Sequence, residues 1–445
     1  MEESNLKGHR HKKNKIMLLP MDGAGHVLSL LGLAFYFKQR FHGPFFVVTK
    51  PFKKYLEDTP FKVRELDNPA YKDDEDPQKR WATEMLRDSY FFRKKPENQL
   101  ELQVKYYTDF VNNVMAVNDQ IAAIIKEEKP ELILVDYYVT VPAVVTSGIP
   151  WSCVVSSNPL CIYRDLYGPP MYSGYGFGAA KSKWRVFKED FDAAIAPVAK
   201  VLADFARPRG VNLPEGVLWM PPETCNIYIY PFEFDYIEVS RKPPKYWTRV
   251  DHFLRPPARA PFGFQLTWLQ ADLKKVYFTL GTMGSADVIL MDKLLRIFAK
   301  TPHQYIISKG PNHDKLLLPP NCSGSQFINQ PAVIPLVDLV IFHGGNNTLV
   351  ESFFHGKPML VLPLFGDQFD NATRVLDRGF GYAFSPYDFD ENLFIIAIND
   401  LLADDTLKKD LKKYSRRMRR TRTAQRAIVL LEGLAETGEE IVVVD

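Results

Sequence analysis

Three segments of the sequence place reactive or hydrogen-bonding side chains beside glycine, between a short apolar run and a helical pattern. In the first, Gly23 and Gly25 precede His26. Glycine permits a tight turn, and His26 then falls at a helix N-terminus, whose positive dipole disfavours the imidazolium. We therefore expect a neutral histidine that can accept a proton. A dinucleotide-binding turn is the alternative, but G-x-G-x-x-G needs a third glycine where Leu28 stands.

The second segment runs from Phe342 to Glu351 and has the sequence FHGGNNTLVE. Its glycines allow an anion to approach closely, and free backbone N–H groups with the side chains of Asn347 and Thr348 supply donors, which is a phosphate cradle. Glu351 lies one helical turn after Asn347, where a carboxylate can accept hydrogen bonds from ribose hydroxyls. An ordinary capped helix, with His343 in a core hydrogen bond, is the alternative.

The third segment, from Pro363 to Asn371, contains Asp367 and Gln368 after another apolar run. At the carboxyl end of a strand these side chains could bind the vicinal hydroxyls of a sugar. An aspartate in this place is as often a helix N-cap. The segment therefore supports a sugar site only together with the other two.

Composition argues against several other kinds of function. The 445 residues carry 56 Lys and Arg against 53 Asp and Glu, a net charge of +3, so no global attraction to nucleic acid or membrane is encoded. The four cysteines form no C-x-x-C pair, and G-x-x-x-x-G-K-[ST], H-E-x-x-H and G-x-S-x-G motifs are absent. We expect reduced cysteines and no metal. The basic stretch Lys408 to Arg422 leaves a polyanion-binding surface as an alternative to a solvated helix face.

No segment predicts a signal peptide or a membrane span. The polar, basic start of the chain has no apolar h-region before Ile16. The most apolar long stretch, Leu132 to Val155, is interrupted by Asp136, Pro142 and Pro150, which indicates two strands and a helix start. We expect a soluble, cytoplasmic protein.

The elements that must position these residues follow an α/β pattern. Short, fully apolar runs alternate with longer helical patterns, as a parallel sheet buried on both faces requires. The predicted strands are Ile16 to Pro20, Phe45 to Thr49, Leu132 to Val135, Cys153 to Ser156, Val276 to Leu280, Gln304 to Ser308, Val340 to Phe342 and Met359 to Pro363. Prolines concentrate between the two series, in Arg241 to Ala271. We predict an N-terminal domain 1–245, a linker 246–272 and a C-terminal domain from 273.

Together these motifs, in this order, resemble the UDP-glycosyltransferases of glycosyltransferase family 1. The most specific part of the resemblance is H-G-G-x-N-[ST]-x-x-E followed by D-Q-x-x-N, between His343 and Asn371. Without a signal peptide or membrane helix, the chain is similar to soluble bacterial, plant and spider-mite members. The resemblance implies a GT-B fold, two Rossmann-like domains facing a cleft, with domain 273–420 holding the UDP-sugar and segment 421–445 returning to the N-terminal domain.

The resemblance also implies roles for single residues. His26 would be the general base, and Asp136, at the end of a predicted strand, would orient it. Phe327 would stack on uracil, Gln330 and Glu351 would hold ribose, and Asp367 with Gln368 the hexose. The full predicted UDP-sugar set is Gly25, Thr282, Phe327, Ile328, Gln330, His343, Gly345, Asn346, Asn347, Thr348, Glu351, Asp367 and Gln368. The reaction would invert the anomeric centre, with UDP-glucose as co-substrate and no cofactor or metal.

The acceptor side is the least specific. Aromatic residues suggest a pocket for a small lipophilic molecule with a hydroxyl, such as a flavonoid or another phenolic xenobiotic. The predicted contacts are Trp81, Phe92 and Tyr172, although each could instead pack the core. Phe327 and Asn329 depart from the family's usual Trp and Pro. A monomeric detoxifying glucosyltransferase is the leading hypothesis; a GT-B transferase for a macrolide or lipid, and a non-catalytic UDP-sugar-binding protein, remain alternatives.

Overall fold

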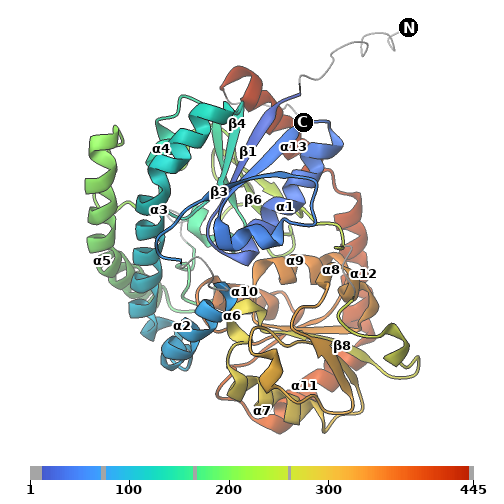
Figure 1. The fold of residues 1–445 in the computed structure, drawn as a ribbon. Helices are drawn as coiled ribbons and strands as arrows, with labels where there is room; N and C mark the ends of the chain where they lie inside the picture. Colours follow the sequence, from blue (N-terminus) through green and yellow to red (C-terminus); the bar gives the residue numbers. More distant parts are fainter. Residues whose placement is uncertain (1–12, 72–76, 164–167, 259–261, 440–445) are drawn as a thin grey trace.

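The computed structural model describes residues 13–71, 77–163, 168–258 and 262–439, which form two stacked α/β domains (Figure 1). Each domain is built on a parallel sheet, seven-stranded in the order β3-β2-β1-β4-β5-β6-β7 and six-stranded in the order β10-β9-β8-β11-β12-β13. This architecture confirms the predicted α/β fold class.

The strands of the N-terminal sheet are β1 Lys15–Pro20, β2 Gly43–Thr49, β3 Lys62–Leu66, β4 Leu132–Asp136, β5 Trp151–Val155, β6 Asn226–Ile229 and β7 Trp247–Val250. Those of the C-terminal sheet are β8 Lys275–Thr279, β9 Gln304–Ser308, β10 Cys322–Ser325, β11 Leu339–Phe342, β12 Met359–Val361 and β13 Gly381–Ala383. The predicted strands all correspond to one of these. Because β7 pairs with β6, the N-terminal sheet extends to Val250, and the predicted boundary at residue 245 is too early.

The helices of the N-terminal domain are α1 Ala24–Gln39, α2 Pro77–Phe92, α3 Leu100–Glu128, α4 Pro142–Val145 and α5 Lys181–Ala206. The C-terminal half contains α6 Gly281–Gly284, α7 Val288–Phe298, α8 Gln330–Val333, α9 Asn346–Phe354, α10 Asp367–Asp377, α11 Glu391–Ala403, α12 Asp405–Arg420 and α13 Thr423–Thr437.

The side chains of β1 show how the N-terminal sheet is buried on both faces. Met17 and Leu19 belong to the apolar cluster beneath α3 and α5, whereas Ile16 and Leu18 belong to the cluster beneath α1 and α13. All four are at most 1% exposed. This two-sided burial explains why β1 is a continuous apolar run and not an alternating one.

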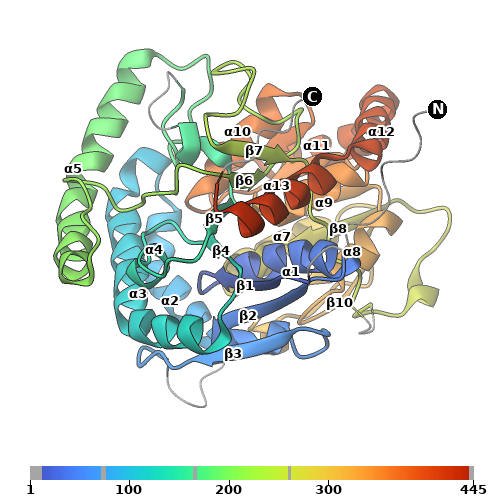
Figure 2. The same ribbon diagram turned by 90° about the horizontal axis from the view of Figure 1, so that it is seen from above.

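Helix α13, the last helix of the chain, packs on the N-terminal domain beside α1 (Figure 2). Its Glu432 accepts hydrogen bonds from Arg40 Nε and Nη2 at 2.5 and 2.7 Å, and lies 2.6 Å from His42 Nε2. These bonds attach α13 to the N-terminal domain.

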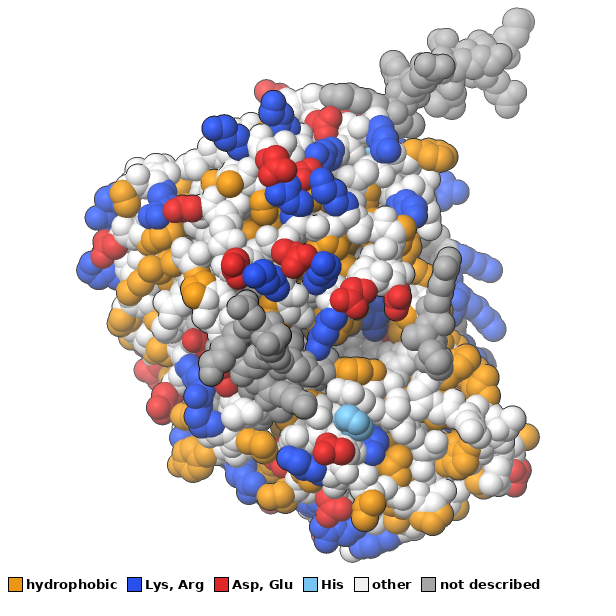
Figure 3. Space-filling model, in the orientation of Figure 1, with side chains coloured by type: hydrophobic (Ala, Val, Ile, Leu, Met, Phe, Trp, Pro, Cys, Tyr) orange, Lys and Arg blue, Asp and Glu red, His pale blue; other side chains and the backbone are white. Residues whose placement is uncertain are grey.

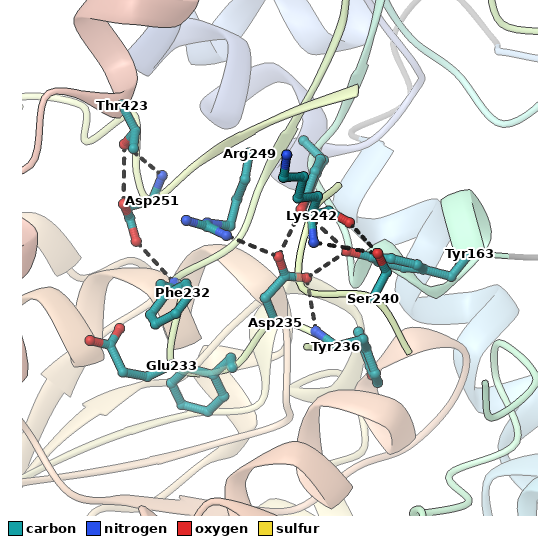
Figure 4. Close-up of polar contacts among 12 residues, drawn as sticks. Tyr163, Phe232, Glu233, Asp235, Tyr236, Ser240, Lys242, Arg249, Asp251 and Thr423 are labelled. Atoms are coloured by element: carbon teal, nitrogen blue, oxygen red, sulfur yellow. Dashed lines mark hydrogen bonds and ion pairs between the residues drawn. The ribbon is translucent and has the colours of Figure 1, made fainter. Parts of the chain in front are cut away.

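A buried polar network joins the N-terminal sheet to the helices that return from the C-terminal domain (Figure 4). Asp235 accepts hydrogen bonds from Tyr163 and Tyr228 at 3.1 and 2.7 Å. Asp251, which is 0% exposed, accepts from Thr423 and from Arg417 of α12 at 3.2 and 2.7 Å. Because buried carboxylates are costly unless paired, this network fixes how α12 leads into α13.

The surface has no dominant charge on the face in Figure 3, where positive and negative side chains are interspersed over the N-terminal domain. This distribution agrees with the net charge of +3. None of the helices in the described ranges combines the length and the apolar run that crossing a bilayer requires.

Candidate active site between the two domains

His26 and Asp136 meet where two neighbouring strands end. β1 pairs with β4 so that Pro20 lies opposite Asp136, and α1 begins four residues after β1. His26 Nδ1 lies 2.9 Å from Asp136 Oδ2 and 3.1 Å from Ser156 Oγ, which itself donates to Asp136 Oδ2 at 2.6 Å. Since a carboxylate only accepts, Nδ1 carries the proton and Nε2 is left as the basic atom.

The charges around His26 set its basicity. Burial by itself lowers the pKa of His26, but the charge and hydrogen bond of Asp136, with the charges of Asp367 and Asp22, outweigh burial and raise the pKa above 6.5. This shift is opposite in direction to the one expected from the helix terminus, because three carboxylates favour the protonated ring. Its side chain is 19% exposed, so Nε2 can reach a ligand.

The glycine-rich turn of the C-terminal domain faces α1. His343 follows β11 and precedes the N-terminus of α9, where Gly345 is the N-cap residue. A Cβ at Gly281 or Gly345 would lie 2.7 or 2.5 Å from the His343 ring, so both positions require glycine. Burial lowers the pKa of His343 to about 4, and the ring is therefore neutral at pH 7. It can donate a hydrogen bond but adds no positive charge.

The two asparagines of the turn bond across the domain interface. Asn346 Nδ2 donates to Ser156 O and Ile229 O at 2.9 and 3.0 Å. Asn347 Nδ2 donates to Gly25 O at 2.8 Å, and Asn347 Oδ1 accepts from Ser29 Oγ at 2.6 Å. In this arrangement two side chains predicted to bind the UDP-sugar hold the domains together.

The residues predicted for ribose form a connected chain of hydrogen bonds. Tyr277 OH donates to Gln330 Oε1 at 3.1 Å, and Gln330 Nε2 donates to Glu351 Oε2 at 2.6 Å. Thr348 Oγ1 accepts from Gln330 Nε2 at 3.3 Å. The structure therefore brings together the two residues predicted for ribose, Gln330 of α8 and Glu351 of α9, with Thr348, which is predicted for the diphosphate.

Three further residues predicted to bind the UDP-sugar lie just before α8 or on α6. Phe327 is 48% exposed, which leaves its ring accessible for stacking, and Ile328 is half-buried just before α8. Thr282 is half-buried on α6, which follows β8. These positions are compatible with the predicted roles, which stay predictions.

Asp367 and Gln368 begin α10 and differ in their surroundings. Asp367 Oδ2 accepts from the backbone N–H of Asn158 at 3.0 Å, across the domain interface. Burial raises the pKa of Asp367, against the opposing effects of that hydrogen bond and of His26. Gln368 Oε1 accepts from the N–H of Leu364 at 2.9 Å. Neither side chain serves as an N-cap, since no side-chain cap bond is present at α10.

A small cavity separates the domains at the donor site. It holds about 20 Å³, roughly one water molecule, and its lining includes Ser29, Arg255, Asn347 and Glu351. A nucleotide-sugar does not fit into this cavity as it stands.

The predicted acceptor residues do not share one pocket. Phe92 is 3% exposed and packs against Phe365 of the C-terminal half, with ring centroids 5.5 Å apart. Tyr172 donates its backbone N–H to Asp370 at 2.6 Å, and its hydroxyl lies 3.3 Å from that of Tyr107. Trp81 belongs to α2, but its side chain lies outside the described part. Phe92 contributes to interdomain packing here, and the acceptor assignments stay predictions.

Three residues at this interface were not predicted as site residues. Ser156 and Asn158 follow β5, and Arg255 lies after β7. Ser156 and Asn158 could have been found from their place after a predicted strand, next to the site edge. Arg255 gives no such signal, because it stands in a proline-rich connection.

The basic stretch lies mostly on α12, with Leu411 and Met418 buried and most Lys and Arg side chains exposed. Arg417 is bound to Glu233 and Asp251, which gives part of the stretch a structural role. Within the described ranges, no three His, Cys, Asp or Glu side chains are grouped so that they could hold a metal ion.

Comparison with known sequences places the C-terminal half in a family. Residues 276–428 match the family described as UDP-glucoronosyl and UDP-glucosyl transferase. The chain is 28% identical over 171 residues to UDP-glucuronosyltransferase 3A1 of Bos taurus, and 36% identical over 142 residues to UDP-glucuronosyltransferase 3A1 of Xenopus laevis. The first match covers 37% of this chain and 33% of the relative, and the second covers 30% and 27%. The chain thus spans about a third of the length of these relatives.

Comparison with solved structures extends the likeness to the whole fold. The glycotransferase of kitacinnamycin is similar with a TM-score of 0.68 and 18% identity, over 94% of this chain and 98% of that one. The glycosyltransferase VinC, solved in complex with DTDP, has a TM-score of 0.66 and 15% identity, over 95% and 99%. These likenesses establish the two-domain GT-B fold. The sequence match over 276–428 makes the C-terminal half similar to the UDP-glucoronosyl and UDP-glucosyl transferases.

Proposed function

We propose that this protein is an inverting glycosyltransferase that moves glucose from UDP-glucose to a hydroxyl of a small lipophilic acceptor. The observation that carries the proposal is the pair of His26 and Asp136, placed at the strand ends that face the glycine-rich turn of the C-terminal domain. A base on one domain and an anion cradle on the other are the two parts that a glycosyl transfer from a nucleotide-sugar requires.

In the proposed mechanism, His26 Nε2 accepts the proton of the acceptor hydroxyl while that oxygen attacks the anomeric carbon and the bond from that carbon to UDP breaks. Asp136 holds the ring by Nδ1 and offsets the positive charge that develops on it. Ser156 bonds both partners and fixes their geometry. The attack on the face opposite UDP inverts the anomeric centre.

The departing diphosphate gains negative charge during this step. The N-terminus of α9 offers free backbone N–H groups, including that of Gly345, with positive dipole character. His343, Asn347 and Thr348 add neutral donors, since the pKa of His343 is about 4. We propose that these groups together stabilise the leaving group and that the reaction needs no metal ion.

The surroundings of Asp367 and Gln368 favour a neutral hexose. The hydrogen bonds to both side chains come from backbone N–H groups, of Asn158 and Leu364, and not from cationic side chains. A glucuronate carboxylate would lie beside the Asp367 carboxyl, which is unfavourable. We therefore propose UDP-glucose, although the sequence relatives are named glucuronosyltransferases.

The acceptor is proposed as a flavonoid or another phenolic xenobiotic. Support comes from aromatic residues around the loop that follows β5, where the rings of Tyr172, Tyr107 and Phe191 lie 6.0–6.5 Å apart. Tyr107 and Phe191 are buried, so the half-buried ring of Tyr172 is the one of the three that could contact a flat apolar acceptor. We propose that the protein acts as a cytoplasmic monomer.

The test is product formation by the full-length protein with a flavonol or a simple phenol as acceptor. UDP-glucose, UDP-glucuronate and dTDP-glucose are compared as donors, and NMR determines the anomeric configuration of the product. We expect a β-glucoside from α-configured UDP-glucose and UDP release that depends on the acceptor. Retained configuration would contradict the mechanism. Binding of UDP without turnover across a broad acceptor panel would instead support a non-catalytic UDP-sugar-binding protein.

A further inference from the structure

Arg255 lies at the cavity between the domains. It follows β7 and precedes two prolines, Pro256 and Pro257. Its Nε lies 3.4 Å from Glu351 Oε1, and the two side chains are 14% and 8% exposed. The cavity that they line also contacts Ser29 and Asn347, so the guanidinium lies among the residues proposed to hold the donor.

The backbone around Arg255 is firmly placed. A Cβ at Gly32 of α1 would lie 2.0 Å from Phe253 O and 3.3 Å from Arg255 N, so this strand exit lies directly against the helix. The ring of Phe253 packs edge-on against Tyr36, with centroids 5.2 Å apart. Pro256 restricts Arg255 to extended backbone. The Arg255 side chain therefore projects from a backbone segment that is packed against α1.

Glu351 receives a hydrogen bond on one carboxylate oxygen and an ion-pair contact on the other. Gln330 Nε2 bonds Oε2 at 2.6 Å, and Arg255 approaches Oε1 at 3.4 Å. The amide of Gln330 is itself oriented by Tyr277, which donates to its oxygen. Because a carboxylate has about four lone-pair sites, each oxygen keeps one free to accept a further hydrogen bond.

Two free acceptor sites on one fixed carboxylate suit two neighbouring hydroxyls. Ribose presents such a pair at its 2′ and 3′ positions, whereas 2′-deoxyribose presents only one. If Glu351 could rotate, it would adapt to either sugar. Because both oxygens of Glu351 are held in place, the carboxylate cannot adjust to 2′-deoxyribose. One of its oxygens would then lack a hydrogen-bond partner in a buried site, which is unfavourable.

We propose that Arg255 is a positioning residue that holds Glu351 against ribose and thereby makes the donor site select ribonucleotides over 2′-deoxyribonucleotides. This role rests on the proposed function, since it requires a nucleotide at Glu351. Arg255 acts through the carboxylate and takes no part in proton transfer. It differs from the predicted donor residues, because it belongs to the N-terminal domain and not to the glycine-rich turn.

The test compares UDP with 2′-deoxy-UDP, which differ by one oxygen atom, by isothermal titration calorimetry on the full chain. We expect wild-type protein to prefer UDP by about tenfold or more and Arg255→Ala to reduce that preference to about threefold or less, mainly by weakening UDP. Arg255→Lys, which keeps a cation near Oε1, should retain an intermediate preference. The control Arg296→Ala removes an exposed guanidinium paired with Asp292 and should leave the preference unchanged.

A double variant tests whether Arg255 acts through Glu351 or contacts the nucleotide directly. In Glu351→Gln protein, adding Arg255→Ala should leave the ratio of the two affinities unchanged within about twofold, because the carboxylate through which Arg255 acts is gone. Equal weakening of UDP and 2′-deoxy-UDP by Arg255→Ala would show a phosphate contact or a structural role and overturn the proposal, while the proposed function would stand. If wild-type protein binds neither nucleotide, the proposed donor site is wrong and this role falls with it.

Discussion

Asp136 Oδ2 lies 2.9 Å from His26 Nδ1, and the aspartate side chain is completely buried. Burial keeps water away from this hydrogen bond, and Ser156 occupies a further site on the same oxygen. The pair is therefore preorganised before any ligand enters, which is what a base that must act in one defined orientation needs.

Asp136→Asn tests how the negative charge of Asp136 affects the pKa of His26. A raised pKa of His26 means that the ring is protonated, and inactive as a base, below that pKa, so activity falls as the pH decreases through it. Removing the Asp136 charge lowers the pKa and moves the acidic limb of the kcat/KM profile to lower pH. The maximal rate should fall about 100-fold or more, because the ring also loses its orientation.

The measurement is kcat/KM from pH 5 to 9 for wild type, Asp136→Asn and Ser156→Ala. Ser156→Ala keeps the charge, so its acidic limb should stay near that of wild type. An acidic limb that does not move in Asp136→Asn would show that His26 is not the titrating group.

Gly345→Ala tests the anion cradle. The new methyl group would lie 2.5 Å from His343 Nε2 and must displace the ring. We expect UDP affinity to fall at least about tenfold, because His343 and the N–H of residue 345 no longer converge on one point. Gly178→Ala, with no atom within 4 Å of the added methyl, is the matched control. Unchanged UDP affinity in Gly345→Ala would place the diphosphate elsewhere.

Asn347→Ala separates phosphate binding from domain closure. Asn347 now bonds Gly25 O and Ser29 Oγ across the interface, and we propose that it turns to the diphosphate when the domains open. Loss of Asn347 should weaken UDP binding about tenfold. Ser29→Ala removes one interdomain bond but no phosphate donor, and its UDP affinity should not fall. Equal UDP affinities in the two variants would show that Asn347 only joins the domains and does not bind the diphosphate.

The sequence predicts the strands and turns that carry the candidate residues where the signal is local. His26, His343 and Asp367 each follow an apolar run and a turn, and the buried strands β1, β11 and β12 are these runs. Five strands are not predicted. In β3, β6 and β7 the polar residues Lys62, Arg64, Asn226 and Arg249 interrupt the apolar pattern. β10 has the polar sequence CSGS, and β13 has only three residues.

What could not be predicted depends on the packing of the two domains. The bonds of Asn346 to Ser156 and Ile229 join residues that are 190 and 117 positions apart. The contact of Arg255 with Glu351 likewise exists only once β7 and α9 are brought together. No short motif encodes such distances, so these partners emerge from the tertiary structure alone.

Glu432→Gln tests the attachment of α13. Burial opposes the effect, but the hydrogen bonds of His42 and Arg40 lower the pKa of Glu432 from 4.5 to about 2. Ionised Glu432 therefore stabilises the folded protein. This contribution is fully present above pH 4.5 and is lost as the pH falls through about 2. At pH 7 the variant should lose unfolding free energy on the order of a few kcal/mol, because its neutral amide forms no ion pair with Arg40.

Urea unfolding at pH 7 and pH 3 measures this effect. The difference between wild type and Glu432→Gln should be smaller at pH 3, where part of the wild-type stabilisation is already lost. Asp292→Asn, at an exposed pair on α7, should change stability by less than about 0.5 kcal/mol. A pH-independent difference would show that the Glu432 charge contributes nothing.

The most direct test of the central claim is the turnover of His26→Ala with UDP-glucose and a phenolic acceptor, measured together with its affinity for UDP. Because His26 is proposed to act only in proton transfer, kcat should fall by about 10²–10⁴-fold. UDP affinity should remain within about twofold of wild type, since the predicted contacts to UDP lie mainly on the C-terminal domain. Normal turnover in His26→Ala would contradict the assignment of His26 as the general base.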